Sequence, residues 1–159
     1  MTIVPVFAHD VTISSGQPIP RFVTIKFDRT NVRIGPGKNH AISRIYIQKG
    51  FPVEITQEYG DWRKIRDFHG NSGWVNKVLL SVKRSAVVSP WERKSKVLKY
   101  INLYKNPTTH AIVIAKIEPG ALLSIRECSG EWCFIANSDI SGWIMQSEIW
   151  GVYPREVFK

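Results

Sequence analysis

Two cysteines are the residues whose type and spacing most directly suggest chemistry in this chain. Cys128 and Cys133 flank the four residues Ser-Gly-Glu-Trp, and the sequence contains two cysteines in all. A turn at Ser129-Gly130-Glu131 would place the two thiols opposite each other on a β-hairpin, where a disulfide is geometrically feasible. A disulfide over so short a loop would stabilise the fold by roughly 2–3 kcal/mol. The competing interpretations are free buried thiols and a metal site, although two thiols without a nearby histidine make a poor zinc site.

The four histidines do not follow a spacing typical of catalysis. They are His9, His40, His69 and His110, and none belongs to an HExxH motif or a similar helix-borne pair. A nucleophilic pair of Cys133 and His110 is conceivable, but we expect neither a helix to carry the cysteine nor a third residue to orient the histidine. We therefore predict a non-enzymatic protein with no metal and no cofactor.

The elements that position these residues are repeated, because the chain contains one motif twice. The segment NVRIGPGKNHAI matches NLYKNPTTHAI, and GWVNKVLL matches GWIMQSEI. Four residues between these segments recur at a constant spacing of 70: His40, Gly50, Gly60 and Trp62 return as His110, Gly120, Gly130 and Trp132. A period of this length indicates two domains of about 60 residues each rather than a solenoid of short repeats. In this alignment Cys128 and Cys133 occupy the positions of Glu58 and Arg63, so only one copy carries the cysteine pair.

Each copy has the turn spacing of an all-β fold. Turn signals follow one another about every ten residues, and the segments between them, such as PVEITQE and WRKIRDF, have the residue types of strands. Residues 76–80 suit a single helical turn. Between the copies, Ala86-Val87-Val88 could pair with a sheet edge and Trp91 could fill the seam, so we expect that segment to be packed. The predicted organisation is a leader remnant or extended lead-in (1–20), a first domain (21–82), a packed linker (83–96), a second domain (97–153) and a tail (154–159).

Charge is distributed unevenly along the chain, whose formal net charge is +9. Residues 21–82 hold eleven Lys/Arg against five Asp/Glu, a net +6, and residues 83–96 hold five against one, a net +4. Residues 97–153 hold four against five, a net −1. A basic first copy and linker favour an anionic partner such as nucleic acid, anionic lipid or cell-wall polymer. The alternative is a solubilising surface, and no dense Lys/Arg cluster typical of a dedicated nucleic-acid binder is present.

The first residues resemble the end of a signal peptide. Val6-Phe7-Ala8 is apolar and ends on a small residue, but a basic segment before it is missing. The alternative is an apolar first strand. We expect export to the periplasm or the medium, chiefly because of the cysteine pair, with a cytoplasmic location as the alternative. No apolar run approaches the roughly 18 residues of a membrane-spanning helix.

The order of motifs resembles the bacterial SH3-like domain. It runs from NVRxGPG to KG with an alternating strand, then GDWxKIR and GxxGWV, and it covers both copies. The second copy departs from it by carrying Lys105-Asn106-Pro107 in place of Gly-Pro-Gly. The whole arrangement, including CSGEWC, is similar to uncharacterised exported SH3-like proteins of alphaproteobacteria. This resemblance implies an all-β fold of two tandem SH3-like antiparallel barrels packed together, and a role in binding, commonly to cell-wall peptides.

The resemblance also implies where a ligand would bind. In SH3-like barrels, aromatic side chains near the long loop and the strand tips form a shallow groove. The implied ligand-binding residues are Tyr46, Glu58, Tyr59, Trp62 and Arg66 in the first copy, with Tyr104 and Trp132 as counterparts in the second. Recurrence of tryptophans at matched places equally suits a structural role, which we expect for Trp74 and Trp143.

Three functions follow as hypotheses. The first is an exported binding protein that recognises a cell-envelope peptide, polymer or protein, with tighter binding and salt sensitivity in the basic first copy. The second is a cytoplasmic protein that binds nucleic acid, and the third is an adaptor that binds an extended segment of another protein. The redox state of the cysteines separates the first from the second, since disulfides persist outside the cytosol.

Overall fold

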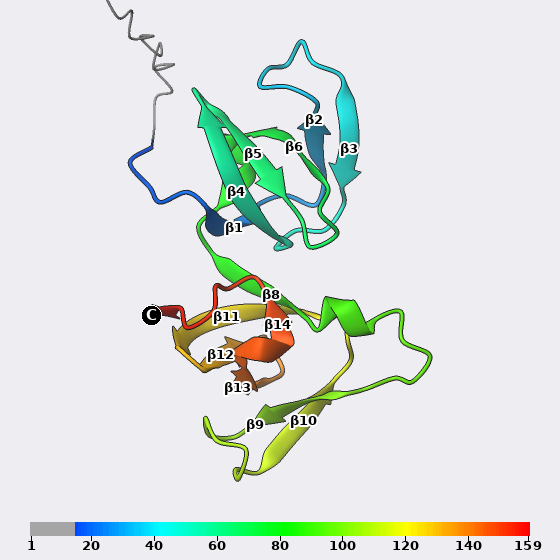
Figure 1. Cartoon of the computed structure of the whole chain (residues 1–159), viewed down its shortest axis with the longest axis vertical. Coiled ribbons are helices and arrows are strands. Elements are labelled where there is room, and N and C mark those ends of the chain that lie inside the picture. The colour runs from blue at the N-terminus through cyan, green and yellow to red at the C-terminus, as the bar shows by residue number, and fades with distance from the viewer. Residues whose placement is uncertain (1–14) are drawn as a thin grey trace, which may run out of the picture.

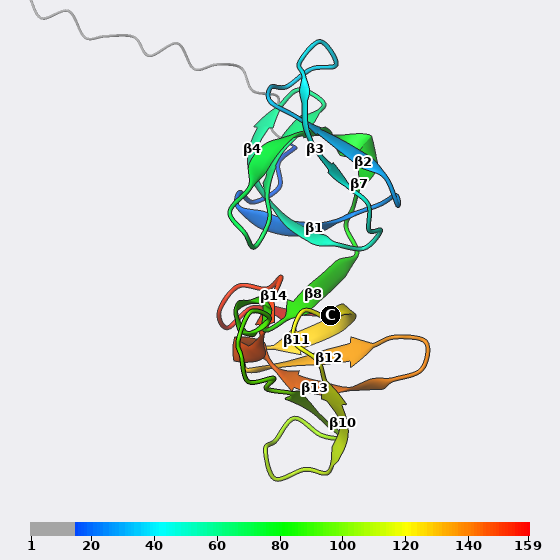
Figure 2. The ribbon, with the colours of Figure 1, turned by 90° about the vertical axis from the view of Figure 1, so that its right-hand side faces the viewer.

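The computed structural model describes residues 15–159 and shows two β-barrels stacked along the long axis of the molecule (Figure 1). The first barrel is one seven-stranded antiparallel sheet with the strand order β3-β2-β6-β5-β4-β1-β7. Its strands are β1 (Arg21–Ile25), β2 (Thr30–Arg33), β3 (Ile42–Tyr46), β4 (Pro52–Tyr59), β5 (Trp62–Arg66), β6 (Ser72–Asn76) and β7 (Leu80–Ser81). Figure 2 looks along this barrel, whose strands form a ring. The all-β prediction is confirmed.

The second barrel repeats the first, strand for strand. Its order is β10-β9-β13-β12-β11-β8-β14, and β15 is added beside β11. The strands are β8 (Arg84–Val88), β9 (Ile101–Tyr104), β10 (Val113–Ile117), β11 (Leu122–Ser129), β12 (Trp132–Ala136), β13 (Ser141–Met145), β14 (Ile149–Trp150) and β15 (Val157–Phe158). The identical order confirms two tandem copies of one architecture.

Short 3-10 turns join some of the strands. They are η1 (Lys77–Leu79), η2 (Pro90–Glu92) and η3 (Gln146–Glu148). At η1 the side chain of Asn76 accepts a hydrogen bond from the Val78 amide at 3.1 Å, which caps the turn as expected for asparagine. No helix in residues 15–159 is long and apolar enough to span a membrane.

Each barrel closes because one long strand bends and pairs on both sides. In β4 the register shifts between Ile55 and Gln57, and in β11 it shifts between Ile125 and Glu127, at equivalent places. Such a bulge inserts an extra residue and bends the strand. Residues 52–55 of β4 pair with β1, and β5 pairs with β4 from Glu54 to Tyr59, so Glu54 and Ile55 pair on both sides.

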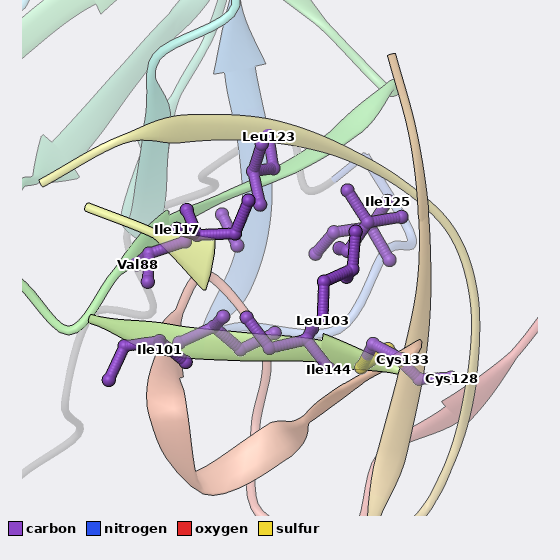
Figure 3. Packing of buried hydrophobic residues seen from close by; sticks show 12 residues of the cluster. Val88, Ile101, Leu103, Ile117, Leu123, Ile125, Cys128, Cys133 and Ile144 are labelled. Carbon is purple, nitrogen blue, oxygen red and sulfur yellow. A yellow bond between two sulfur atoms is a disulfide. The ribbon is translucent and has the colours of Figure 1, made fainter. Parts of the chain in front are cut away.

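The core of each barrel is built from aliphatic side chains on alternate strand positions. In the first barrel these are Val23, Ile25, Val32, Val53, Ile55, Ile65 and Val75. In the second they include Ile101, Leu103, Ile135 and Ile144, with Cys128 and Cys133 at the edge of the cluster (Figure 3). Trp74 is buried, as expected, whereas Trp143 is half-buried and lies 5.3 Å from the Phe134 ring.

The connection between the copies is part of the second barrel. Residues 84–88, which lie inside the segment expected to be a linker, form β8 and pair with β11 and β14. Ala86-Val87-Val88 therefore joins a sheet, as the sequence suggests. Trp91 does not fill the seam, because it lies on η2 with 54% of its surface exposed.

The two barrels pack through β1 and β8, which lie at the seam (Figure 1). Four of the five residues in each strand are buried, so both faces of each strand are covered. Val23 and Ile25 face the first core, while Phe22 lies against the rings of Trp150 and Tyr153 in the second barrel. The expected leader remnant or extended lead-in spans residues 1–20, and its residues 1–14 lie outside the described residues.

Candidate functional site

The predicted disulfide is present. Cys128 and Cys133 are bonded, with their Cα atoms 4.1 Å apart at facing positions of β11 and β12. Both residues are buried, and their sulfur atoms border the aliphatic core of the second barrel (Figure 3). The pair therefore covalently joins the two strands of one hairpin, and the described residues contain no free cysteine.

Glu58, predicted to contact a ligand, is instead a buried structural residue. Its carboxylate accepts hydrogen bonds from the Ser15 amide at 2.8 Å and the Ser15 hydroxyl at 2.6 Å. Arg21 Nη1 lies 2.8 Å and Arg63 Nε 3.5 Å from the same carboxylate. Burial alone would raise the pKa of Glu58, but the hydrogen bonds from Ser15 and Arg21 and the charge of Arg63 lower it to about 2. This carboxylate ties the lead-in to the barrel.

Tyr46 makes internal contacts rather than an open binding surface. Its hydroxyl donates a 2.8 Å hydrogen bond to Asp67 Oδ2, and its ring stacks on Phe51 at 5.7 Å. Burial, together with the bond to Asp67, raises the pKa of Tyr46. Asp67 is buried and also accepts hydrogen bonds from the amides of His69 and Asn71, so this group holds the turn that follows β5.

Arg66 belongs to the seam between the barrels. Its guanidinium is hydrogen-bonded to Glu54, which is 4% exposed. The other oxygen of Glu54 accepts a 2.6 Å hydrogen bond from the Tyr153 hydroxyl in the second barrel. Burial and the bond to Glu54 raise the pKa of Tyr153, so this hydroxyl keeps its proton and stays a donor. The chain Arg66–Glu54–Tyr153 thus joins the two barrels.

Trp150 and Tyr153 contact the first barrel at the seam, and the sequence reasoning did not identify them. Trp150 meets the ring of Phe22 at 5.0 Å and that of Phe68 at 6.1 Å. In the repeat alignment Trp150 falls opposite Ser81, so an aromatic residue replaces a small one. This difference between the copies could have indicated the contact from the sequence, because two otherwise equivalent barrels need a non-equivalent residue where they meet.

A tryptophan at the tip of the equivalent hairpin has an aromatic neighbour in both barrels. Trp62 and Trp132 open β5 and β12, and both are half-buried. In the first barrel Tyr59 is 55% exposed and faces Trp62 across the hairpin. In the second barrel Tyr104 meets Trp132 edge to face, with the ring centroids 5.6 Å apart. Of the predicted ligand-binding residues, these four form two separate aromatic pairs, and Arg66 is also exposed although it bonds Glu54.

The pair in the second barrel has polar neighbours. Asn102 Nδ2 donates a hydrogen bond to the Tyr104 hydroxyl at 3.2 Å, and Lys116 Nζ donates to Asn102 Oδ1 at 3.4 Å. Met145 faces Trp132 across the sheet. Flat rings beside hydrogen-bonding groups can bind an amphipathic ligand through apolar area and a few oriented polar contacts.

Metal binding has no geometric basis in the described part of the chain. Among residues 15–159, no three or more His, Cys, Asp and Glu side chains lie close enough to hold a metal ion.

Comparison with known proteins identifies both barrels. The family model of the bacterial SH3 domain matches residues 26–81 and 97–151. The comparison with curated proteins gives no significant match.

Solved structures resemble the chain over part of their length. NlpC1 from Trichomonas vaginalis is 13% identical with a TM-score of 0.34, covering 87% of this chain and 48% of that one. An NlpC/P60 family protein from Bacillus cereus ATCC 10987 is 10% identical with a TM-score of 0.35, covering 84% and 57%. NlpC2 from Trichomonas vaginalis is 13% identical with a TM-score of 0.34, covering 85% and 49%. The chain spans about half the length of these proteins.

Proposed function

The chain belongs to the bacterial SH3 domain family, and from this premise we propose that it is a non-enzymatic binding protein that recognises a peptide or polymer of the cell envelope. Bacterial SH3 domains are typically cell-wall binding modules, which supports this class of ligand. The observation that carries the proposal is a tryptophan at the same hairpin tip of each barrel, Trp62 and Trp132, each beside a tyrosine. The tyrosine differs between the copies: it is Tyr59 of β4 in the first barrel and Tyr104 of β9 in the second. Because the two tryptophans are equivalent in the repeat, one type of extended ligand can contact both.

The proposed contacts are stacking and hydrogen bonding rather than chemistry on the ligand. Tryptophan and tyrosine offer large rigid surfaces at little cost in conformational entropy, and such residues often dominate binding energy. The first barrel is the basic copy, so we expect it to bind an anionic ligand more tightly than the second.

The experiment is a titration with soluble peptidoglycan fragments, monitored by calorimetry. We expect Trp62→Ala and Trp132→Ala each to weaken binding about tenfold or more, and Trp62→Ala to have the larger effect. Trp91→Ala is the matched control, since Trp91 is an exposed tryptophan on η2, outside both hairpins. Circular dichroism checks that each variant is folded. A folded double variant with wild-type affinity would rule out these pairs as the site.

Two further measurements test the rest of the proposal. Mass spectrometry of the fragments after long incubation should show no new products, and any turnover would contradict a purely binding role. Alkylation of whole cells should leave Cys128 and Cys133 unmodified, because an exported protein keeps its disulfide. Modified cysteines in cells would favour the cytoplasm.

A further inference from the structure

A recess of about 530 Å³ lies at the seam, and its walls come from both barrels. The first barrel contributes Lys26 and Lys49, and the connection between the barrels contributes Lys83. The second barrel contributes Leu122 and Ser124 from β11. The volume lies in the range typical of sites for small ligands or fragments of larger ones.

Three positive charges at this recess are not neutralised by the protein. Lys26, Lys49 and Lys83 are exposed, and none forms an ion pair within residues 15–159. No aspartate or glutamate is found among the residues that line the recess. Arg84 also lines it, but its guanidinium already bonds Glu156 at 2.9 Å. Like charges around a concave surface reinforce one another, so the recess attracts anions.

The hydroxyl groups of Thr24 and Ser85 hold the walls of the recess in place through hydrogen bonds between the first barrel and the connection. Thr24 Oγ1 donates to the Lys83 carbonyl at 3.0 Å, and the Ser85 hydroxyl donates to the Gly50 carbonyl. The Lys83 backbone is therefore tied to β1 and that of Gly50 to β8. Ile25, Phe27 and Leu122 add apolar area to the lining. A ligand would meet a formed site with both charge and apolar surface.

In the second barrel, the side chain of Arg93 occupies the place that corresponds to the recess. The Gly50 amide donates to the Ile25 carbonyl at 2.7 Å, and the Gly120 amide donates to the Val88 carbonyl at 2.6 Å, so the two turns correspond. At Gly120 the side chain of Arg93 packs so tightly that an added Cβ would lie 2.9 Å from its Cδ. At Gly50 the atom nearest to an added Cβ would be Leu122 Cδ2, 3.8 Å away. This turn borders the recess.

We propose that the lysine-lined recess at the seam binds a multiply anionic ligand whose charged groups are carboxylates or phosphates. The inference deepens the proposed function by adding a charge-recognising site to the aromatic pairs, and it rests on that function only for the source of the ligand. Lys26 and Lys49 contact the anion from the first barrel, and Lys83 contacts it from the connection. Binding weakens as salt rises through the physiological range, because exposed charges are screened over about 8 Å there.

The test uses two small probes on the full chain at low salt. Citrate supplies carboxylates and inorganic pyrophosphate supplies phosphates. Backbone amide shifts in NMR spectra, followed at Gly50, Lys83 and Ser124, report binding at the recess. The test variant is Lys26→Gln/Lys49→Gln/Lys83→Gln. The matched control is Lys38→Gln/Lys94→Gln/Lys105→Gln, which removes the same charge from exposed lysines that do not line the recess.

We expect saturable shifts at the recess with at least one probe and a loss of affinity of about tenfold in the test variant, because three exposed charge pairs are removed. The control should stay within about twofold of the wild type. The tighter probe identifies the charged group of the ligand. Absence of saturable shifts with both probes, or equal losses in the test and control variants, would overturn the site. Peptidoglycan binding that is lost in Trp62→Ala but kept in the lysine variant would leave the proposed function intact and reject the recess alone.

Discussion

At the residue scale, the two copies hold the same hairpin together with different chemistry. Glu58 faces Arg63 across β4 and β5, and Cys128 faces Cys133 across β11 and β12. The first copy uses a buried ion pair at this position, and the second uses a covalent bond. Both residue pairs occupy buried positions of the hairpin. Glu58 of the ion pair also accepts a hydrogen bond from Ser15 in the lead-in.

The disulfide is expected to contribute about 2–3 kcal/mol to the free energy of unfolding. Cys128→Ala/Cys133→Ala should lose that amount in urea melts under oxidising conditions, and reductant should shift the wild type but leave the variant unchanged. A variant as stable as the oxidised wild type would contradict the stabilising role. Mass spectrometry of non-reduced wild type supplies the control for bond formation.

The ion pair should make stability depend on pH in the acid range. The ordinary pKa of Glu58 is 4.5, and in the folded protein it is about 2. A lowered folded pKa stabilises the fold above the unfolded value, and this contribution is lost as the pH falls from about 4.5 to about 2. At pH 7 we expect Glu58→Gln to cost about 3 kcal/mol, because it leaves the buried Arg63 with a weakened partner.

The measurement is the difference in unfolding free energy between wild type and Glu58→Gln from pH 7 down to pH 2. That difference should shrink through the acid window. Glu131→Gln is the control, because Glu131 is an exposed carboxylate at the equivalent hairpin turn of the second barrel. A pH-independent difference between wild type and Glu58→Gln would refute the assignment.

At the element scale, each barrel depends on a glycine where two strands cross closely. Gly73 of β6 passes β2, and an added Cβ would lie 2.4 Å from Val32 Cγ1. Gly142 of β13 passes β9, and an added Cβ would lie 2.8 Å from the Tyr104 carbonyl oxygen. This requirement explains why the Gly-Trp pair recurs in both copies.

Gly142→Ala should therefore destabilise the second barrel by about 1–3 kcal/mol, because the backbone at Tyr104 has to move. Urea melts measure the loss, and amide shifts at Leu103 and Tyr104 should change. Ser141→Ala is the control, since Ser141 precedes Gly142 in β13 and is exposed. Unchanged stability together with unchanged shifts at β9 would show that the crossing tolerates a methyl group.

At the scale of the whole molecule, the seam makes the two barrels one cooperative unit. Phe22 packs between Trp150 and Tyr153, and the Tyr153 hydroxyl bonds Glu54. Domains of about 60 residues bury a limited share of their surface and are marginal alone, so each barrel gains from the contact. Strands β1 and β8 are buried on both faces for this reason.

We expect a single unfolding transition in denaturant, coincident in tryptophan fluorescence and far-UV dichroism. Trp150→Ala should remove about 3 kcal/mol and separate the transition into two, because it removes the ring contacts with Phe22 and Phe68. Trp91→Ala is the matched control and should keep one transition. Two transitions in the wild type would mean that the barrels fold independently.

Much of the fold followed from local sequence patterns and from their repetition along the chain. The constant spacing of 70 predicted two equivalent domains, and the cysteines opposite each other on a hairpin predicted the disulfide. These features depend on local turns and on the alternation of polar and apolar residues along each strand. Each turn needs a particular residue type, and successive side chains of a strand point to opposite faces. The role of Arg84–Val88 as a first strand was hidden, since it corresponds to Arg21–Ile25 at a spacing of 63 instead of 70.

Tertiary structure decides which of the predicted binding residues are accessible to a ligand. The sequence alone determined that Glu58, Arg66 and Tyr46 are polar or aromatic residues near strand ends, but not whether their partners lie inside the protein. Partners from distant segments decided that: Ser15 and Arg21 for Glu58, and Tyr153 for the Glu54 carboxylate that holds Arg66. The same packing left Lys26, Lys49 and Lys83 around a recess. A side chain is available to a ligand only when no part of its own chain satisfies it, and that is a property of the packed barrels.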